Sequence, residues 1–219
     1  ALGAGAAGTL NMWYESDVDA LMTRTCLRPI PTGQVTKNQA LFFGILLSIG
    51  SISLLYYSSN LMSASLLLLT ICFYFFIYTV WLKRRTPQNI VIGGAAGALP
   101  PVIGWTIATG SLTIEPFILF LIIFLWTPSH FWALSIYKSS DYKKAKIPML
   151  PIIYGIEKTK KNIFIYSLLM LPTISAPYFI SFLSKIYFYP ALALTIYYIY
   201  LCGTLLKVKK NKEINTLAR

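Results

Sequence analysis

Six separate stretches of this chain are each long and apolar enough to cross a lipid bilayer as a helix. A hydrocarbon core about 30 Å thick requires about 20 apolar residues in a helix. Because a spanning segment must pair its own backbone polar groups in lipid, continuous apolar runs of this length favour helices. The sequence therefore predicts an all-α fold, a polytopic transmembrane helix bundle. Its six spans are expected at residues 38–59, 61–82, 89–109, 113–137, 162–183 and 186–206.

Composition excludes the other broad classes of protein. Charged residues make up 12% of the chain and apolar residues 56%, whereas soluble domains usually carry about 25% charged residues. Disorder and nucleic-acid-binding tails do not fit a chain whose apolar residues are gathered in long runs. Residues 1–10 form one more apolar, glycine-rich run. We interpret this run as the end of a seventh helix.

Charge is segregated to one side of the predicted bundle. Lys and Arg number 19 against 7 acidic residues, a net charge of +12, and Lys185 is the single cation in the short connections. Basic loops face the cytoplasm, so the long connections are expected in the cytoplasm of a bacterium, or in the matrix if the protein lies in the mitochondrial inner membrane. The cations on this side are Arg24, Arg28, Lys37, Lys83, Arg84, Arg85, Lys138, Lys143, Lys144, Lys146, Lys158, Lys160, Lys161, Lys207, Lys209, Lys210, Lys212 and Arg219.

Three oxygen-bearing side chains follow the first apolar run at intervals of four. Asn11, Glu15 and Asp19 would share one face of a helix, because four residues advance the helix by little more than one turn. Mg²⁺ prefers oxygen ligands and is commonly held by one or two carboxylates together with substrate phosphates. The spacing therefore favours a site for a Mg²⁺-diphosphate. The alternative is a solvated helix end.

On the charged side of the predicted bundle, further cations and the expected N-terminus of a helix follow in the sequence. Arg24 and Arg28 lie in the next loop, and a triplet of cations closes the second span just before Asn89. Helix N-termini and guanidinium groups both bind anionic oxygen, although topology and snorkelling would also explain such charges. The candidate substrate-binding residues are Arg24, Arg28, Lys83, Arg84, Arg85, Asn89 and Lys138.

The third candidate group begins with the chain's single histidine. His130 lies in an apolar span, where an ionisable group is a functional candidate by default. If the helix continues past Tyr137, offsets of 7 and 11 residues place Tyr137 and Asp141 in nearly the same direction as His130. The alternative is a hydrogen-bonded core histidine. Together with the cations and the three oxygen ligands, this pattern favours a binding site for an amphiphile with a diphosphate head.

Several of these motifs resemble a known family. The pattern Asn11-x-Trp13-x-Glu15-x-x-x-Asp19, followed by Met22-x-Arg24-Thr25-x-x-Arg28-Pro29, resembles the first aspartate motif of the UbiA superfamily of membrane prenyltransferases. Three further strings resemble the haem-farnesylating branch of this superfamily, the protohaem IX farnesyltransferases. They are Tyr78 to Ile90, Gly93 to Trp105, and His130 to Trp132 with Asp141 to Pro151.

The resemblance implies a nine-helix membrane enzyme that transfers a farnesyl group from farnesyl diphosphate to a vinyl group of haem B, giving haem O. Residues 1–219 would then be one prenyltransferase domain lacking the first and last helices. Haem B, farnesyl diphosphate and the lipid bilayer are the implied partners, with haem A synthase or terminal oxidase assembly factors as protein partners and no nucleic acid. Two rivals remain open: a related enzyme that prenylates a quinone precursor, and a non-enzymatic carrier of haem or lipid.

The resemblance also implies roles for the residues. The catalytic set is Asn11, Glu15, Asp19, Asp141, His130 and Tyr137. Its first four members would hold Mg²⁺ and the diphosphate, and nearby cations would neutralise the departing charge. Glu15 stands where the superfamily usually has Asp, and Ala145 follows Asp141 in place of a second carboxylate. Two questions stay open. One is whether one or two metal ions bind, and the other is whether His130 ligates the haem iron or makes a polar contact.

Overall fold

The computed structural model describes residues 1–209 and 211–218, and these residues form helices and connecting turns without any strand. Six helical segments are long and apolar enough to cross a membrane, which confirms the spans expected from the sequence. The elements are α1 (Leu2–Tyr14), α2 (Ser16–Leu21), α3 (Lys37–Ser58), α4 (Leu61–Cys72), the π-helix η1 (Phe73–Leu82), α5 (Asn89–Ala98), α6 (Pro100–Thr109), α7 (Ile114–Tyr137), α8 (Ser139–Lys144), α9 (Leu150–Ile153), α10 (Ile156–Phe179), α11 (Lys185–Lys207) and α12 (Asn211–Leu217).

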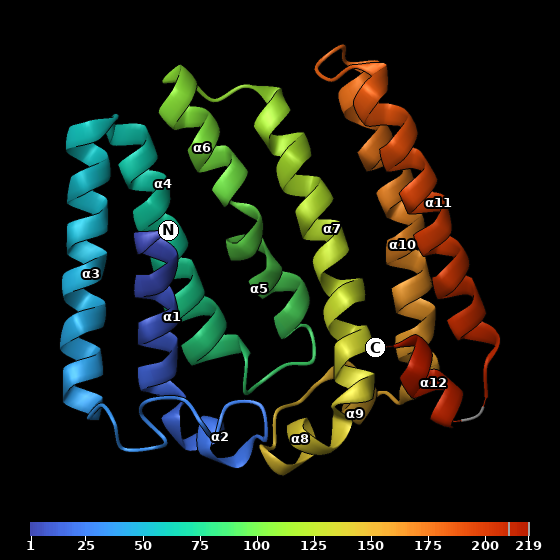
Figure 1. Ribbon diagram of the computed structural model, residues 1–219, viewed down its shortest axis with the longest axis horizontal. Helices are drawn as coiled ribbons and strands as arrows, with labels where there is room; N and C mark the ends of the chain where they lie inside the picture. The colour runs from blue at the N-terminus through green and yellow to red at the C-terminus, as the bar shows by residue number, and fades with distance from the viewer. Residues whose placement is uncertain (210, 219) are drawn as a thin grey trace.

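The long helices stand side by side (Figure 1). Helix α1 packs against α3 and η1, α5 packs between η1 and α7, and α10 packs between α7 and α11. The short helices α2, α8, α9 and α12 gather at one end of the bundle, which we call the loop end. Between 17% and 39% of each span is buried. The remaining apolar surface is suited to contact with lipid, as expected for an integral membrane protein.

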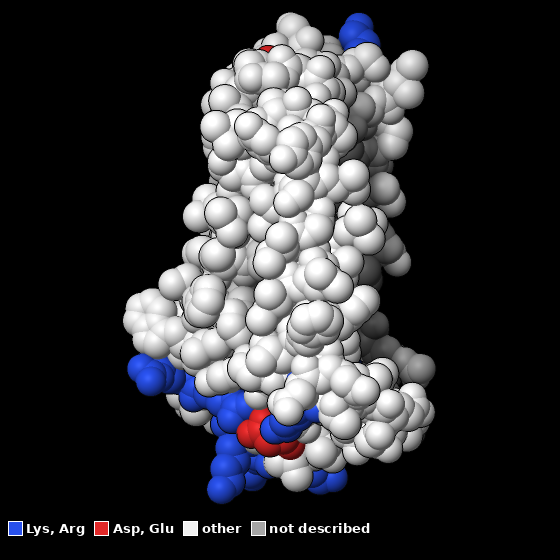
Figure 2. Space-filling model, turned by 90° about the vertical axis from the view of Figure 1, so that its left-hand side faces the viewer, with Lys and Arg blue, Asp and Glu red and all other residues white. Residues whose placement is uncertain are grey.

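Charged side chains gather at the loop end. Figure 2 shows Lys and Arg concentrated there, with a long uncharged surface separating them from the opposite end. On the face that this view shows, the charges have the single-sided distribution expected from the sequence. Of the predicted cations, Lys210 and Arg219 lie outside the described residues, as does the side chain of Lys212.

Two spans are locally interrupted. The third is divided at Leu99, because Pro100 has no N–H to continue the helix and so begins α6. At the far end of α6, Gly110 has a φ of 69°, a left-handed conformation that glycine adopts without strain and that turns the chain toward α7. The second span ends in η1, where the backbone N–H of Lys83 donates to the carbonyl of Tyr78 five residues earlier at 2.9 Å. Nothing in the apolar sequence of this segment predicted a π-helix.

Candidate functional site

A cavity of about 420 Å³, here called the polar cavity, opens among helices α1, α2, η1, α5 and α7 and the segment after α8. It lies where the spans meet the loop end. Most of its wall is apolar and aromatic, but six of the predicted site residues line it. These six are Asn11, Asp19, Arg24, Arg28, Lys83 and Asn89.

The junction of α1 and α2 places Glu15 beneath this cavity. The side-chain amide of Asn11 donates to Glu15 Oε2 at 2.8 Å, and the ammonium of Lys83 forms an ion pair with the same oxygen. Glu15 is 1% exposed, and its other oxygen, Oε1, is buried without a hydrogen-bond partner among the described residues. A buried carboxylate oxygen of this kind is an unused acceptor or ligand.

Asp19 lies one helical turn further on and faces the cavity. Its Oδ2 accepts a charge-assisted hydrogen bond from Arg28 at 2.7 Å, and its side chain is 5% exposed. The hydroxyl of Thr25 donates to the Asp19 carbonyl at 2.9 Å, which fixes the loop. On the same loop the Arg24 guanidinium lies 5.9 Å from the centre of the Tyr142 ring. Asn11 and Glu15 are therefore in contact, as their spacing predicted, and Glu15 and Asp19 each pair with a cation.

Asn89 begins helix α5 at the wall of the polar cavity. Its side-chain amide donates to the carbonyls of Thr86 at 2.7 Å and Lys83 at 3.2 Å. These two bonds fix the side chain and leave Oδ1 buried without a partner among the described residues. Asn89 and Glu15 thus each present an unused oxygen beside Lys83.

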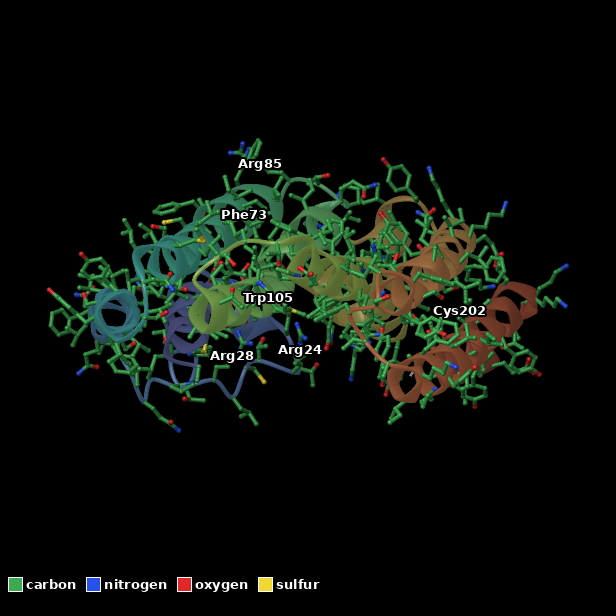
Figure 3. The ribbon with its side chains drawn as sticks, turned by 90° about the horizontal axis from the view of Figure 1, so that it is seen from above. Arg24, Arg28, Phe73, Arg85, Trp105 and Cys202 are labelled. Atoms are coloured by element: carbon green, nitrogen blue, oxygen red, sulfur yellow. The ribbon has the colours of Figure 1, made fainter. Side chains whose placement is uncertain are left out.

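Two predicted cations lie outside the cavity. Arg84 forms two hydrogen bonds with Asp17, at 3.0 and 2.8 Å, on the exposed side of α2. The Arg84 guanidinium holds the pKa of the Asp17 carboxyl below its usual value, and Asp17 in turn raises the pKa of Arg84. Arg85 is exposed and lies on the opposite side of the molecule from Arg24 and Arg28 (Figure 3). The structure therefore separates Arg84 and Arg85 from the groups that line the cavity.

The expected single helical face of His130, Tyr137 and Asp141 is wrong. Helix α7 ends at Tyr137, and Lys138, with φ −103° and ψ 23°, leaves the helical path before α8 begins. Asp141 therefore lies on α8, where its Oδ1 accepts from the Thr23 hydroxyl at 2.9 Å. The Lys138 ammonium lies 4.8 Å from the centre of the Tyr137 ring. Neither Asp141 nor Lys138 lines the polar cavity.

Thr79 is a site residue that the sequence analysis missed. It is fully buried in η1, where its hydroxyl accepts from the Asn11 amide at 3.1 Å and donates to the Tyr74 carbonyl at 2.9 Å. Donation to a carbonyl five residues earlier depends on the wide π-helical turn. The only signal in the sequence is a hydroxyl residue within an apolar aromatic run.

We expect Thr79→Val to lower both stability and turnover. Valine keeps the shape but leaves the buried Asn11 amide and Tyr74 carbonyl each short of a partner, at a cost of about 1–3 kcal/mol. Thr79→Ser restores the hydroxyl and should recover most of both properties. Thr195→Val, which removes a buried hydroxyl bonded to its own helix in α11, is the matched control and should leave turnover unchanged. Thermal unfolding in detergent and steady-state assays provide the two readouts, and equal losses at both positions would contradict a positioning role.

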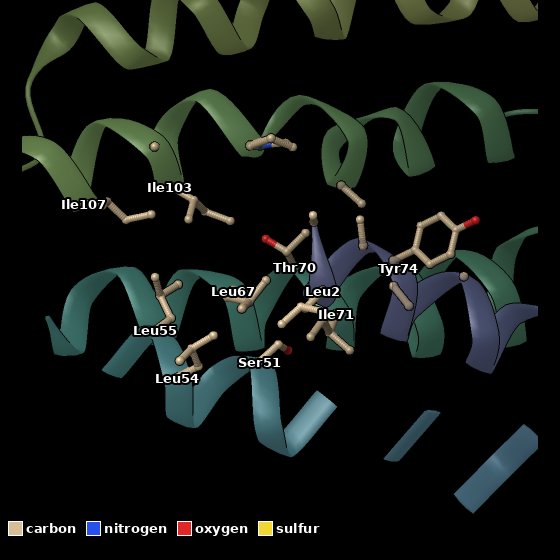
Figure 4. A pocket seen from close by; sticks show the side chains of 18 of the residues that line it. Leu2, Ser51, Leu54, Leu55, Leu67, Thr70, Ile71, Tyr74, Ile103 and Ile107 are labelled. Atoms are coloured by element: carbon tan, nitrogen blue, oxygen red, sulfur yellow. The ribbon is translucent and has the colours of Figure 1, made fainter. Parts of the chain in front are cut away.

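A second, apolar cavity of about 620 Å³ adjoins the first, and Tyr74 and Gly97 line both. Figure 4 shows Ile103 and Ile107 facing Leu67 and Thr70 across it. The two cavities together present a polar, charged compartment next to an apolar one. An amphiphile with an anionic head and a hydrocarbon tail matches this arrangement.

Several known proteins are similar to this chain. The model of the UbiA prenyltransferase family matches residues 1–218. A protoheme IX farnesyltransferase of Pelagibacter ubique is 70% identical over 96% of this chain and 70% of its own length. Those of Acidiphilium cryptum (48% identical, covering 100% of this chain and 69% of the relative) and Parvibaculum lavamentivorans (55%, 85% and 59%) are also similar. The chain thus spans between 59% and 70% of these three relatives.

Solved structures share the fold. A structure concerning digeranylgeranylglyceryl phosphate synthase superimposes with a TM-score of 0.77 at 20% identity, covering 99% of this chain and 75% of the other. A UbiA homologue from Archaeoglobus fulgidus bound to DMAPP and Mg²⁺ gives a TM-score of 0.74 at 16% identity, with coverage of 99% and 80%. At these identities the likeness concerns the arrangement of helices alone.

Proposed function

The chain belongs to the UbiA prenyltransferase family, and from this membership we propose that it transfers the farnesyl group of farnesyl diphosphate to a vinyl group of protohaem IX (haem B), releasing diphosphate and forming haem O. The names of the similar proteins supply the two substrates. In the reaction the allylic C–O bond breaks and diphosphate leaves with the bonding electrons. The π electrons of the vinyl group form the new C–C bond, and water adds to the carbocation left beside the porphyrin ring, losing a proton to give the hydroxyl group of haem O.

The observation that carries this proposal is the junction of the two cavities. Cationic Arg24, Arg28 and Lys83 line the polar cavity, and the adjoining apolar cavity begins at Tyr74 and Gly97. Farnesyl diphosphate has the same division into a multiply charged head and a hydrocarbon tail. The head would lie at the loop end and the tail would extend between α4 and α6.

The oxygen ligands fit a Mg²⁺ ion that arrives with the diphosphate. Within the part of the chain that the structure describes, no group of three or more His, Cys, Asp or Glu side chains forms a metal centre on its own. Mg²⁺ commonly completes its coordination with substrate phosphates and water, and Glu15 Oε1 is a buried oxygen without a partner. Asn11, Glu15 and Asp19 would hold the ion. Asp141 is bonded to Thr23 and does not line the polar cavity, so it stays a proposed fourth ligand that would have to approach the ion on binding. The bound ion would supply positive charge to the leaving diphosphate.

The chain's own cations have a related task. Lys83 is paired with Glu15, and Arg28 with Asp19, so both are held in place before substrate binds. Fixed positive charge next to a leaving group stabilises the transition state without reorganisation. The unpaired Oδ1 of Asn89 is an acceptor, so it would contact the diphosphate head through Mg²⁺ or a bound water. We do not include Arg84, Arg85 and Lys138 among the cations that would contact the diphosphate.

The charge distribution supports an orientation for the site. Loops rich in Lys and Arg remain on the cytoplasmic side, so the loop end would face the cytoplasm of a bacterium, or the matrix in a mitochondrial inner membrane. Haem O is a precursor in the formation of the haem A of terminal oxidases. Haem A synthase and oxidase assembly factors are therefore the protein partners that we propose to test.

The test is pigment analysis in membranes that lack haem O. The chain is expressed there, the haems are extracted, and the farnesylated product is sought by chromatography and mass spectrometry. We expect haem O to appear with the unaltered protein. Good expression without haem O, together with prenylation of an added quinone precursor, would overturn the assignment of the acceptor.

A further inference from the structure

The position of His130 on α7 relates it to the polar cavity. Ile123, Trp126, Thr127 and Phe131 of this helix line the cavity. At 100° per residue, His130 projects in a direction between those of Trp126 and Thr127. His130 is exposed and contacts both Trp126 and Phe131. His130 is not itself a lining residue, but it projects from the face of α7 that lines the polar cavity and contacts two of the lining side chains.

The neighbouring rings fix the imidazole. The His130 ring stacks on Trp126 with centroids 4.4 Å apart and an interplanar angle of 14°. The Phe131 ring meets it edge-on at 5.4 Å and 79°. Among the described residues, no hydrogen bond engages either ring nitrogen. An imidazole that is held by stacking and keeps both nitrogens unused is poised to bind a ligand.

We propose that His130 is an axial ligand of the acceptor's iron, and that it places the haem macrocycle at the edge of the polar cavity between α5 and α7. This inference rests on the proposed function, because haem enters only as the substrate named there. Neutral imidazole is a standard ligand of haem iron. The adjacent Trp126 and Phe131 provide apolar aromatic surface for the flat macrocycle.

The cations at the loop end match the anionic propionate groups of the haem. His130 lies seven residues before the end of α7, which corresponds to about 10 Å along the helix. The loop end, with Arg24 and Arg28, is therefore on the side where the anionic propionates would point. Two residues that line the polar cavity, Met22 and Met149, carry soft sulfur atoms, but both are buried, at 3% and 1% exposure. His130 is the accessible ligand.

The experiment compares three porphyrins as probes. The chain is purified through an affinity tag without histidine, reconstituted in nanodiscs, and titrated with ferric protohaem, zinc protoporphyrin IX and metal-free protoporphyrin IX. A nitrogen-ligand signature in the Soret band or in electron paramagnetic resonance can come from an imidazole or from an amine such as Lys83. Its loss in a variant of the chain's one histidine assigns it to His130. His130→Phe keeps a ring against Trp126 and removes the nitrogens, and His130→Ala leaves room for added imidazole.

We expect His130→Phe to bind metal-free protoporphyrin like the unaltered chain, while its dissociation constants for ferric protohaem and zinc protoporphyrin rise about tenfold or more. Added imidazole should restore the nitrogen signature in His130→Ala. An unchanged iron spectrum in His130→Phe, or equal weakening for all three porphyrins, would overturn iron ligation. Haem O formation without a histidine signature would reject this inference alone, whereas ligation without haem O formation would reject the proposed function alone.

Discussion

An Asp19→Asn protein is expected to lose farnesyl transfer by about 100- to 1,000-fold, the usual effect of removing one group that stabilises transition-state charge. Asp19 is buried at the wall of the polar cavity and pairs with Arg28. The amide occupies nearly the same volume but has no negative charge, so it binds Mg²⁺ weakly and no longer neutralises Arg28. The loss should appear mainly in kcat, with a higher Mg²⁺ requirement.

Asp17→Asn is the matched control for this experiment. The two aspartates lie on the same short helix, α2, and undergo the same chemical change, but the Asp17 side chain is 57% exposed and pairs with Arg84 outside the cavity. Exposed ion pairs contribute little to stability, about 0–1 kcal/mol. We therefore expect activity close to that of the unaltered protein. Both variants are assayed for haem O formation over a Mg²⁺ titration, with thermal unfolding to confirm folding. Similar losses at the two positions would show that Asp19 acts through α2 as a whole and has no role as a ligand.

The spans and the charged end could be predicted from the sequence because both follow from local composition. A run of about 20 apolar residues specifies a membrane helix without reference to its neighbours, and loop charge specifies orientation. The grouping of Asn11, Glu15 and Asp19 could also be predicted, because the helical hydrogen-bond spacing of four residues continues from α1 into α2. The backbone N–H of Asp19 still donates to the Glu15 carbonyl at 2.8 Å.

Other features depend on contacts that a sequence pattern does not contain. The end of α7 at Tyr137 separates Asp141 from the face of His130. The apolar span was expected to end at this residue, but the end of an apolar run does not show whether the helix continues into the polar residues that follow. The direction of Arg84 follows from its pair with Asp17, 67 residues away in the chain. The π-helix places Thr79 against Asn11, and an apolar segment gives no indication of whether its turns have four or five residues.

Gly93→Ala is expected to have the largest effect on folding. A Cβ at this position would lie 2.6 Å from Cε2 of Tyr78 and closer still to Cδ2. Helix α5 therefore packs closely against η1 at Gly93, whereas a Cβ at Gly97 would meet nothing within 4 Å. Forced insertion of a methyl group into a packed interface costs about 1–3 kcal/mol.

The same substitution should also reduce activity, because Tyr78 lines the polar cavity and its ring centre lies 5.7 Å from the Lys83 ammonium. Displacing the ring moves the wall of the cavity beside the Lys83–Glu15 pair. Gly50→Ala in α3, where a Cβ also meets nothing within 4 Å, is the control and should be neutral or stabilising by about 0.5–1 kcal/mol, since alanine favours helix over glycine. Thermal unfolding and haem O formation are measured for both variants. If Gly93→Ala matched Gly50→Ala in both, the contact between α5 and η1 would not determine the position of Tyr78. Loss of activity at unchanged stability would instead indicate that the tyrosine ring moves into the cavity at little cost to the fold.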